Sequence, residues 1–269
     1  MTDWLHVGRA DTPLLLAFPH GGSHLPVAHE VMFRSEALAL RDTDWHIRSL
    51  YDGLAQATYV WTDISRSIID CNRDPAGVSL YPGQATTGLC PTETFDGEPL
   101  YRDGHGPDVD ARLNDYFRPY HAALQAEIDR LLANHDRVVL LDCHSIRSQV
   151  PRLFDGLLPE LNFGTNGGAT CDPALERAVL EAAGSRSQVV NGRFRGGWTT
   201  RHYGRPERRV HAFQLEIAQR AYLREPDMDR PPRVWRPPYD PDYAVPLRAD
   251  LSRILAAALS FALNTGADQ

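Results

Sequence analysis

The sequence predicts an α/β protein in which helices cover both faces of a mostly parallel β-sheet. Short apolar runs alternate with stretches whose apolar residues recur at helical spacing, which is the pattern of strand and helix units that follow one another. The run 138–141 is apolar at every position, as is typical of a strand buried on both faces. The 269 residues could form one large domain or two smaller ones. Since no segment is typical of a linker, we expect a single domain spanning residues 1–269.

The first part of the chain is predicted to hold two strands with a helix between them. Residues 13–18 form an apolar run that ends in a Pro-His-Gly-Gly sequence, which predicts a strand followed by a turn. Residues 37–57 predict an amphipathic helix with Asp42 and Asp44 in its first turn, since acidic side chains suit a helix N-terminus. Residues 58–61 predict the next strand.

Residues 74–107 are rich in glycine, proline, threonine and tyrosine and show little periodicity. They predict a long irregular excursion, and loops of that length in compact domains are usually functional. A loop that covers the substrate and a plain surface insertion both remain open.

The second part of the chain continues the alternation. Amphipathic or apolar patterns predict helices at 110–134, 173–183 and 248–264, and strands at 138–141, 188–190 and 210–217. Several of the strand-like runs in the whole chain end in polar residues, and open α/β sheets bind their ligands at the carboxyl ends of strands.

Composition excludes several classes of partner. The net charge of -7 offers no basic surface for nucleic acid, and no apolar run approaches the roughly 18 residues that a membrane helix needs. The N-terminus has no signal-peptide pattern, so we predict a cytoplasmic protein without nucleic-acid or membrane partners. The four cysteines form no Cys-x-x-Cys pair and are expected to be reduced. The oligomeric state is left open.

The run Asp142-Cys143-His144-Ser145 follows the most apolar strand. It places an imidazole at the predicted carboxyl edge of the sheet, although a polar cluster there could also simply cap the next element. Strand alternation turns Cys143 to the other face, so we do not expect a catalytic cysteine.

His20, Asn72-Arg73 and Glu216 also follow or end apolar runs, and Asp44 lies in the helix after the first strand. Two histidines and a carboxylate are a ligand set for a catalytic divalent metal, with Glu216 as proton acceptor and Arg73 as a fixed cation. This set favours metal-assisted hydrolysis of an amide or ester. Each residue could instead be structural: the histidines hydrogen-bonded, Asp44 at a helix N-terminus, and Arg73 and Glu216 in ion pairs.

The order of motifs resembles the N-formylglutamate amidohydrolase family from about Leu14 to Tyr222. The matching segments are Pro19-His20-Gly21-Gly22, Arg41-Asp42-Thr43-Asp44-Trp45, Ser65-Arg66, Ile69-Asp70-Cys71-Asn72-Arg73, Asp142-Cys143-His144-Ser145, Gly196-Gly197-Trp198-Thr199-Thr200-Arg201-His202-Tyr203-Gly204 and Gln214-Leu215-Glu216-Ile217.

The resemblance implies a fold like that of the zinc carboxypeptidases and aspartoacylase, within the phosphorylase/hydrolase-like class. This is a single three-layer α/β/α domain with a mixed, mostly parallel central sheet. It implies that His20 and His144 bind the metal and that Glu216 is the general base. The carboxypeptidase pattern has a glutamate three residues after the first histidine, where this chain has Ser23. We therefore expect Asp44 to be the acidic ligand, with His24 as a less favoured neighbour.

The implied reaction converts N-formyl-L-glutamate and water into formate and L-glutamate, the last step of a histidine-degradation route. The resemblance makes Asn72 and Arg73 a substrate-gripping pair, and Asp142 and Ser145 can orient His144. The metal is expected to be zinc, with cobalt or another divalent ion as alternatives. A small dianionic substrate needs local positive charge. The pair Gly196-Gly197 would let the backbone approach this substrate closely, although it could equally form a tight turn. The remaining predicted substrate-binding residues are Arg66, Arg195, Arg201 and Tyr203.

Two other functions remain open. The protein could be a related metal-dependent amidase or deacylase that acts on another N-acyl amino acid. It could also be a non-enzymatic protein that binds small anions through its arginines, which would leave Glu216 and the histidines without a joint purpose.

Overall fold

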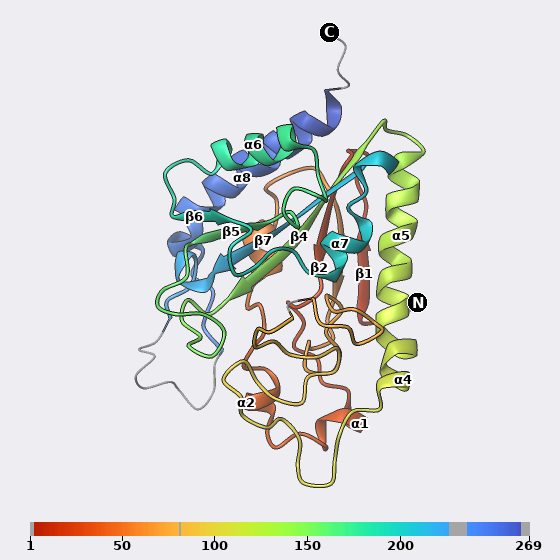
Figure 1. Ribbon diagram of the computed structural model, residues 1–269, viewed down its shortest axis with the longest axis vertical. Helices are drawn as coiled ribbons and strands as arrows, with labels where there is room; N and C mark the ends of the chain where they lie inside the picture. The colour runs from red at the N-terminus through yellow and green to blue at the C-terminus, as the bar shows by residue number, and fades with distance from the viewer. Residues whose placement is uncertain (1–2, 81, 226–235, 265–269) are drawn as a thin grey trace.

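The computed structural model describes residues 3–80, 82–225 and 236–264, and its centre is a seven-stranded mixed sheet (Figure 1). The strands lie in the order β1-β3-β2-β4-β7-β5-β6. Neighbouring strands are parallel except for the pairs β1–β3 and β5–β7. Their bounds are β1 Leu5–Gly8, β2 Leu14–Phe18, β3 Thr58–Thr62, β4 Val138–Ile146, β5 Leu161–Gly164, β6 Gln188–Val190 and β7 Val210–Ala218. The mixed, mostly parallel sheet predicted from the sequence is confirmed.

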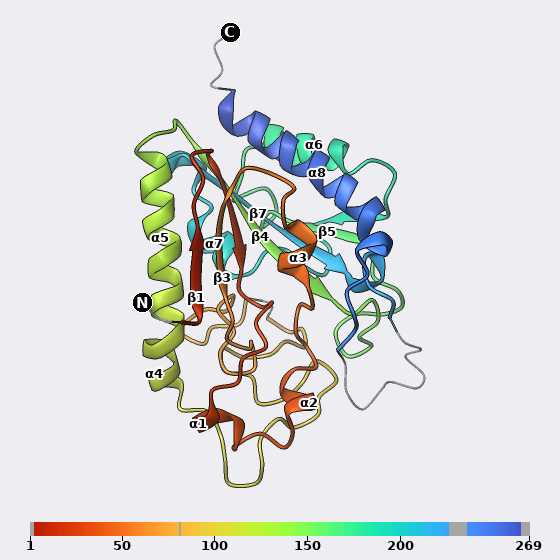
Figure 2. The same cartoon turned by 180° about the vertical axis from the view of Figure 1, so that it is seen from behind.

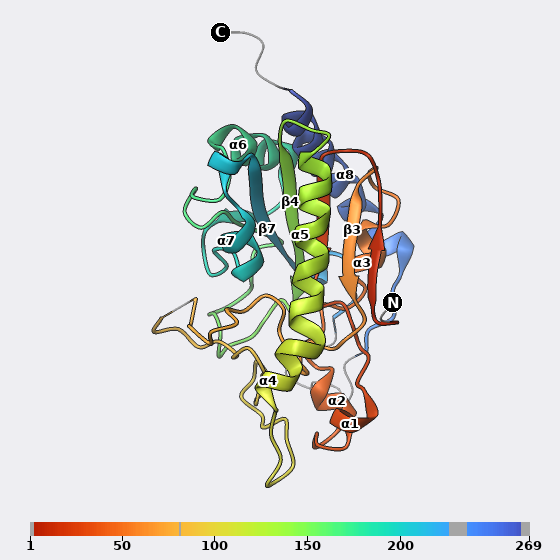
Figure 3. The same cartoon turned by 90° about the vertical axis from the view of Figure 1, so that its right-hand side faces the viewer.

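Helices cover both faces of the sheet, as predicted for a three-layer α/β/α fold (Figures 1 and 2). One face carries α4 Val109–Arg112, a π-helical turn Leu113–Phe117, α5 Arg118–Leu132 and α7 Trp198–Tyr203. The other carries α3 Ile47–Tyr51, α6 Pro173–Ala182 and α8 Pro241–Leu263; Figure 3 shows α5 and α8 separated by the sheet. The short helices α1 Val27–Glu30 and α2 Glu36–Ala39 lie beyond the strand ends, and two 3-10 turns span Pro206–Arg208 and Gln219–Ala221.

Strand β4 is longer than predicted, and this changes how the polar run 142–145 is placed. The strand does not end at Leu141 but continues in register with β7 to Ile146, and every one of its residues is buried. The polar side chains are therefore held inside the sheet, where an adjacent strand fixes their direction. They do not lie in a loop beyond it.

The predicted helix at 37–57 is wrong as a continuous element. The structure has α2 and α3 there, separated by a non-helical segment that contains Asp42 and Asp44. The Asp44 N–H donates to the carbonyl of His20 at 3.1 Å, and His46 has a left-handed φ of 59°. These tertiary constraints override the helical periodicity, so Asp44 precedes α3 and does not lie in its first turn.

The remaining elements differ less from expectation. The sequence patterns predicted α5, α6, β6 and β7 within a few residues, whereas α8 begins earlier than residue 248. The short elements β1, β5 and α7 were not predicted. Among its described residues the excursion 74–107 contains no helix or strand, as expected, and Figure 1 shows it gathered beyond the carboxyl ends of the central strands. Within the described ranges, no helix has the length and apolar character needed to cross a membrane.

Candidate metal centre and active site

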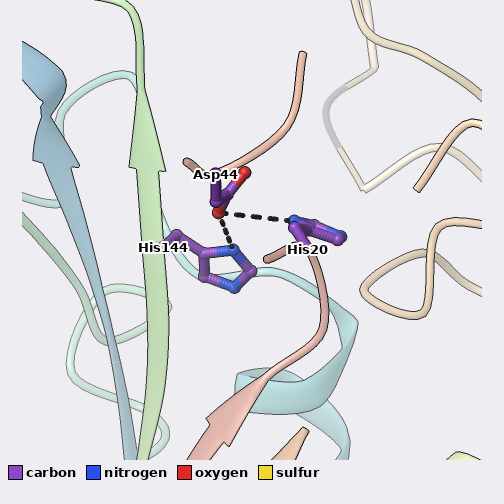
Figure 4. Close-up of side chains that lie close together, drawn as sticks. All are labelled: His20, Asp44 and His144. Carbon is purple, nitrogen blue, oxygen red and sulfur yellow. Dashed lines mark hydrogen bonds and ion pairs between the residues drawn. The ribbon is translucent and has the colours of Figure 1, made fainter. Parts of the chain in front are cut away.

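Three side chains from separate parts of the fold meet at the carboxyl edge of the sheet (Figure 4). His20 follows β2, Asp44 precedes α3 and His144 lies in β4. Their potential ligand atoms all lie within 4.8 Å of one another. Asp44 Oδ2 is 3.8 Å from His20 Nδ1 and 3.2 Å from His144 Nδ1, so both imidazoles turn the same nitrogen toward the carboxylate. All three side chains are buried.

The outer nitrogen of each histidine meets a second carboxylate. His20 Nε2 lies 2.7 Å from Asp70 Oδ1, and His144 Nε2 lies 2.9 Å from Asp142 Oδ1. At His20, an Nε2–H that donates to the Asp70 carboxylate leaves Nδ1 as the ligating atom, which is the usual arrangement around a metal-binding histidine. His20 Nδ1 is fully buried and has no hydrogen-bond partner among the described residues. A divalent cation would satisfy it, and a donor set of two nitrogens and an oxygen suits zinc.

The electrostatics of the two histidines differ. Burial lowers the pKa of His20 to about 4, so its imidazole is neutral near pH 7, as metal binding requires. Burial also acts to lower the pKa of His144, but Asp142 and Asp44 outweigh it and raise that pKa well above the usual value. A cation bound at this triad would have to displace the His144 proton, which makes metal binding stronger as the pH rises.

Glu216 lies directly opposite His144 in the parallel register of β4 and β7. Paired residues on adjacent strands share a face, so the carboxyl group and the imidazole project to the same side of the sheet. Burial raises the pKa of Glu216 to about 8, with Asp44 adding to the shift and His144 opposing it. Gln214 Nε2 donates to Glu216 Oε2 at 3.2 Å and helps to fix its orientation. The carboxyl group can therefore exchange a proton near neutral pH.

A cavity with an empty volume of about 510 Å³, counting its mouth, opens onto these groups. Seven predicted residues line the cavity, namely His20, Arg66, Asn72, Arg73, His144, Gly197 and Glu216. The sequence reasoning missed other lining residues, among them Thr86, Thr87 and Phe95 from the excursion, and Arg193 and Phe194 from the loop after β6.

The excursion contributes a firmly held wall to this cavity. Residues 93–98 are bound through the ion pair between Arg147 and Asp96, at 2.9 Å, and through Arg152 and Glu93. The segment 85–87 is held by Arg73, whose Nε donates to the Thr87 carbonyl at 3.0 Å. The excursion is thus part of the site and is not a plain surface insertion.

Comparisons with known proteins identify the family of this chain. The family model of N-formylglutamate amidohydrolase matches residues 12–223, a range that includes the triad and Glu216. The chain belongs to this family. It is 47% identical over 233 residues to N-formylglutamate deformylase of Pseudomonas aeruginosa, covering 84% of this chain and 87% of that protein. It is 44% identical over 264 residues to the Pseudomonas putida protein of that name, covering 95% of both.

Two solved structures share the fold. The N-formylglutamate amidohydrolase of Ralstonia eutropha superposes with a TM-score of 0.75 at 20% identity, covering 97% of this chain and 99% of that one. A gene product of Agrobacterium tumefaciens gives a TM-score of 0.70 at 18% identity, with coverages of 97% and 96%. At these identities the likeness concerns the fold alone.

Within the family motifs, Asn72 is engaged at both ends of its amide. Its Nδ2 donates to Asp142 Oδ2 at 2.9 Å and lies 2.8 Å from His144 Nε2, while its Oδ1 accepts from the Thr199 N–H at 2.9 Å. A Cβ added to Gly197 would lie 2.5 Å from Asn72 Oδ1 and closer still to Nδ2 and Cγ. The close backbone approach predicted at Gly197 is therefore made to Asn72.

The predicted arginines separate into two groups. Arg66 is buried and forms ion pairs with Asp44 Oδ1 at 3.2 Å and with Asp70 Oδ2 at 2.7 Å. Much of its positive charge is therefore balanced by the carboxylates around the triad. Arg73 is more accessible and lies 3.6 Å from Asp70 Oδ2. Arg195 and Arg201 do not line the cavity: Arg195 is exposed, and Arg201 Nε donates to the Gly196 carbonyl at 2.8 Å.

Tyr203 also lies away from the cavity, since its hydroxyl contacts buried His121 beneath α7 at 3.1 Å. His24 is exposed outside the triad. Asp142 is placed to orient His144 as predicted, whereas the Ser145 N–H donates to Asp44 Oδ2 at 2.9 Å and so positions a different ligand.

Cys143 faces away from His144 and packs against α3, as the strand alternation predicted. Burial raises the pKa of its thiol well above the usual value, which disfavours a nucleophilic thiolate.

Proposed function

We propose that this protein hydrolyses N-formyl-L-glutamate to formate and L-glutamate, using a divalent metal, with zinc as the first candidate and cobalt or another divalent ion as alternatives. The observation that carries the mechanism is the buried His20–Asp44–His144 cluster facing Glu216 across two paired strands. Two relatives named N-formylglutamate deformylase, 44–47% identical over most of the chain, support the substrate.

His20, Asp44 and His144 would hold the metal, and Asp70, Asp142 and the Ser145 N–H would fix these ligands in place. When bound, such an ion supplies a Lewis acid for the formyl carbonyl and lowers the pKa of water.

Glu216 would carry the proton that amide hydrolysis has to move. Its carboxylate accepts a proton from the attacking water and returns it to the glutamate nitrogen as the C–N bond breaks, so the amine leaves in a neutral form. The raised pKa of about 8 suits both transfers near neutral pH. Arg73, at the cavity wall, would bind a substrate carboxylate.

This reaction is proposed to be the last step of a histidine-degradation route in the cytoplasm. The substrate is expected to be a free small dianion, with no nucleic-acid or membrane partner.

The test combines metal analysis with a formate-release assay on the full chain. We expect about one divalent ion per chain and faster formate release from N-formyl-Glu than from N-formyl-Asp, with no turnover-linked formate from N-acetyl-Glu. His20→Ala and Asp44→Ala should lose the ion, while His105→Ala, which alters an exposed histidine, should keep it. A protein without stoichiometric metal that stays inactive after zinc or cobalt is restored would exclude this mechanism. Turnover of another N-acyl amino acid in preference to N-formyl-Glu would instead indicate a related amidase.

A further inference from the structure

Tyr203 belongs to a motif that the proposed function does not use. Its side chain is buried and lies outside the cavity, on the face of the sheet where α5 and α7 lie side by side (Figures 1 and 3). The Tyr203 hydroxyl contacts His121 Nδ1 at 3.1 Å and also donates to the His121 carbonyl at 3.1 Å. Tyr203 therefore holds one side of a buried histidine that the sequence reasoning did not single out.

The other side of the His121 ring faces the chain just before Asn72. Its Nε2 lies 2.8 Å from the Cys71 carbonyl, which can only accept a hydrogen bond. Burial lowers the pKa of His121 to about 3, so the ring is neutral near pH 7 and carries a single N–H. That hydrogen must therefore lie on Nε2, and Nδ1 accepts from the Tyr203 hydroxyl. The two hydrogen bonds fix both the tautomer and the direction of the ring.

The peptide groups on both sides of Asn72 are held by these two helices. His121 Nε2 donates to the carbonyl before Asn72, and the Trp198 N–H of α7 donates to the Asn72 carbonyl at 3.2 Å. Trp198 also packs against His121, with ring centroids 4.5 Å apart in edge-to-face geometry. Helices α5 and α7 therefore fix the backbone at residue 72, and the direction of the Asn72 side chain follows from that backbone.

The Asn72 side chain connects this backbone to the candidate metal centre. Its Nδ2 donates to Asp142 Oδ2 at 2.9 Å, and Asp142 Oδ1 lies 2.9 Å from His144 Nε2. All three side chains are buried. A shift of Asn72 would allow the Asp142 carboxylate to turn, and with it the imidazole that this carboxylate orients. His121 thus begins a series of contacts that ends at a predicted metal ligand.

We propose that His121, oriented by Tyr203, is a positioning residue that sets the affinity of the centre for its divalent ion. His121 does not line the cavity, so it acts through the Cys71–Asn72 peptide. The inference rests on the proposed function, since the triad must hold that ion. Loss of a residue that orients a metal ligand typically weakens metal binding by about 10- to 100-fold. We expect the lower end of this range, because His121 acts one step further away.

The test measures the affinity of the full chain for Zn²⁺ by competition with a chromophoric chelator, at a temperature well below unfolding. His121→Leu should weaken Zn²⁺ binding by about tenfold. His121→Gln should restore most of the affinity, because its amide can still donate to the Cys71 carbonyl. Tyr203→Phe should give a smaller loss, since the bond to Cys71 remains.

His211→Leu is the matched control. His211 is also buried and accepts a hydrogen bond, from the Asp172 N–H at 3.1 Å, but it lies at the opposite end of β7 from Glu216. Its replacement should lower the stability of the protein and change Zn²⁺ affinity by less than about twofold, because distant sites act independently.

A double-mutant cycle with Asn72→Ala separates positioning from a general loss of stability. If His121 acts through Asn72, His121→Leu should have little further effect on Zn²⁺ affinity once residue 72 is alanine. A full loss that persists in the Asn72→Ala background would overturn the inference, as would an equal loss in His211→Leu. Should His121→Leu fail to fold, Tyr203→Phe carries the same comparison, and an unchanged affinity there would overturn the inference.

Zn²⁺ affinity also keeps this inference distinct from the proposed function. If His121→Leu weakens Zn²⁺ binding but the wild type releases no formate from N-formyl-Glu, the inference is supported and the proposed function fails. If formate is released and Zn²⁺ affinity is unchanged in His121→Leu, the proposed function stands and the inference is overturned. A wild-type chain that binds neither Zn²⁺ nor Co²⁺ would overturn both.

Discussion

Replacement of Gly197 by alanine tests whether the hydrogen bonds of the Asn72 side chain stabilise the site. Gly197 has φ -83° and ψ -164°, which an alanine can adopt, so the substitution adds no backbone strain. The new Cβ, however, would lie 2.5 Å or less from Asn72 Oδ1, Cγ and Nδ2. Non-bonded heavy atoms rest at about 3.5 Å or more, so the amide or the backbone must move by about 1 Å.

The cost follows from the two hydrogen bonds that a movement of this size breaks. The bond from the Thr199 N–H to Asn72 Oδ1 is neutral and contributes about 1 kcal/mol, and the bond from Nδ2 to the Asp142 carboxylate contributes about 2 kcal/mol. The expected destabilisation is therefore about 3 kcal/mol. For a chain of 269 residues this corresponds to a drop in Tm of roughly 5 °C.

Calorimetric melting measures this drop, and the metal affinity of the variant should fall as well, since the displaced amide presses on His144. Gly106→Ala is the matched control: nothing lies within 4 Å of its added Cβ, and its φ is not in the left-handed region. We expect that control to change the free energy of unfolding by less than about 0.5 kcal/mol. A Gly197→Ala variant that melts within about 1 °C of the wild type would refute the reasoning, because it would show that the neighbours of Asn72 absorb the extra carbon without loss.

Two further predictions concern titratable groups. Glu216→Gln preserves shape but removes the proton acceptor, so kcat should fall by about 10²–10⁴-fold with the metal content unchanged; retention of most activity by the metal-loaded variant would contradict the assigned role. Burial lowers the pKa of His121 to about 3, so below pH 6.5 the unfolded chain gains a proton that the folded protein does not. The contribution of His121 should therefore lower the free energy of unfolding by about 1.4 kcal/mol for each unit by which the pH decreases, from about pH 6.5 to about pH 3. Urea unfolding should show that the wild type loses about 2 kcal/mol of unfolding free energy relative to His121→Gln when the pH is lowered from 7 to 5. If the difference between the two proteins is the same at both pH values, this linkage is ruled out.

The central strands were predictable because burial on both faces demands apolar side chains at nearly every position. That rule located β2 and the first half of β4. The same rule predicted a β4 that is shorter than the observed strand, because Asp142 and His144 interrupt the apolar run. Polar residues can occupy a buried strand where neighbouring groups satisfy them. Here those neighbours are Asn72, Asp44 and the paired strand β7. The site was visible in the sequence as an interruption of the strand pattern.

The segment 40–46 was not predictable from local pattern. Apolar residues there recur at helical spacing, yet the chain leaves the helix so that Asp44 can reach His20, Arg66 and Ser145. Those contacts join segments that lie far apart in the sequence, and their combined hydrogen bonds outweigh a helix propensity of a few tenths of a kcal/mol per residue. Asp44 was correctly selected as the third member of the cluster, but the reason given for its position was wrong.

The choice among arginines shows most clearly where sequence reasoning ends. Arg193 and Arg195 stand two positions apart in one loop, yet Arg193 lines the cavity and Arg195 is exposed. Alternation along a strand would place both on the same side, but residues 191–197 form no strand, so alternation does not apply there. Directly after Arg195 the chain packs against β5: a Cβ at Gly164 would lie 2.7 Å from the Arg195 carbonyl carbon, and Gly196 has a φ of 102°. A contact between β5 and a distant loop therefore helps to set which arginine faces the cavity, and no local pattern in 193–201 encodes it.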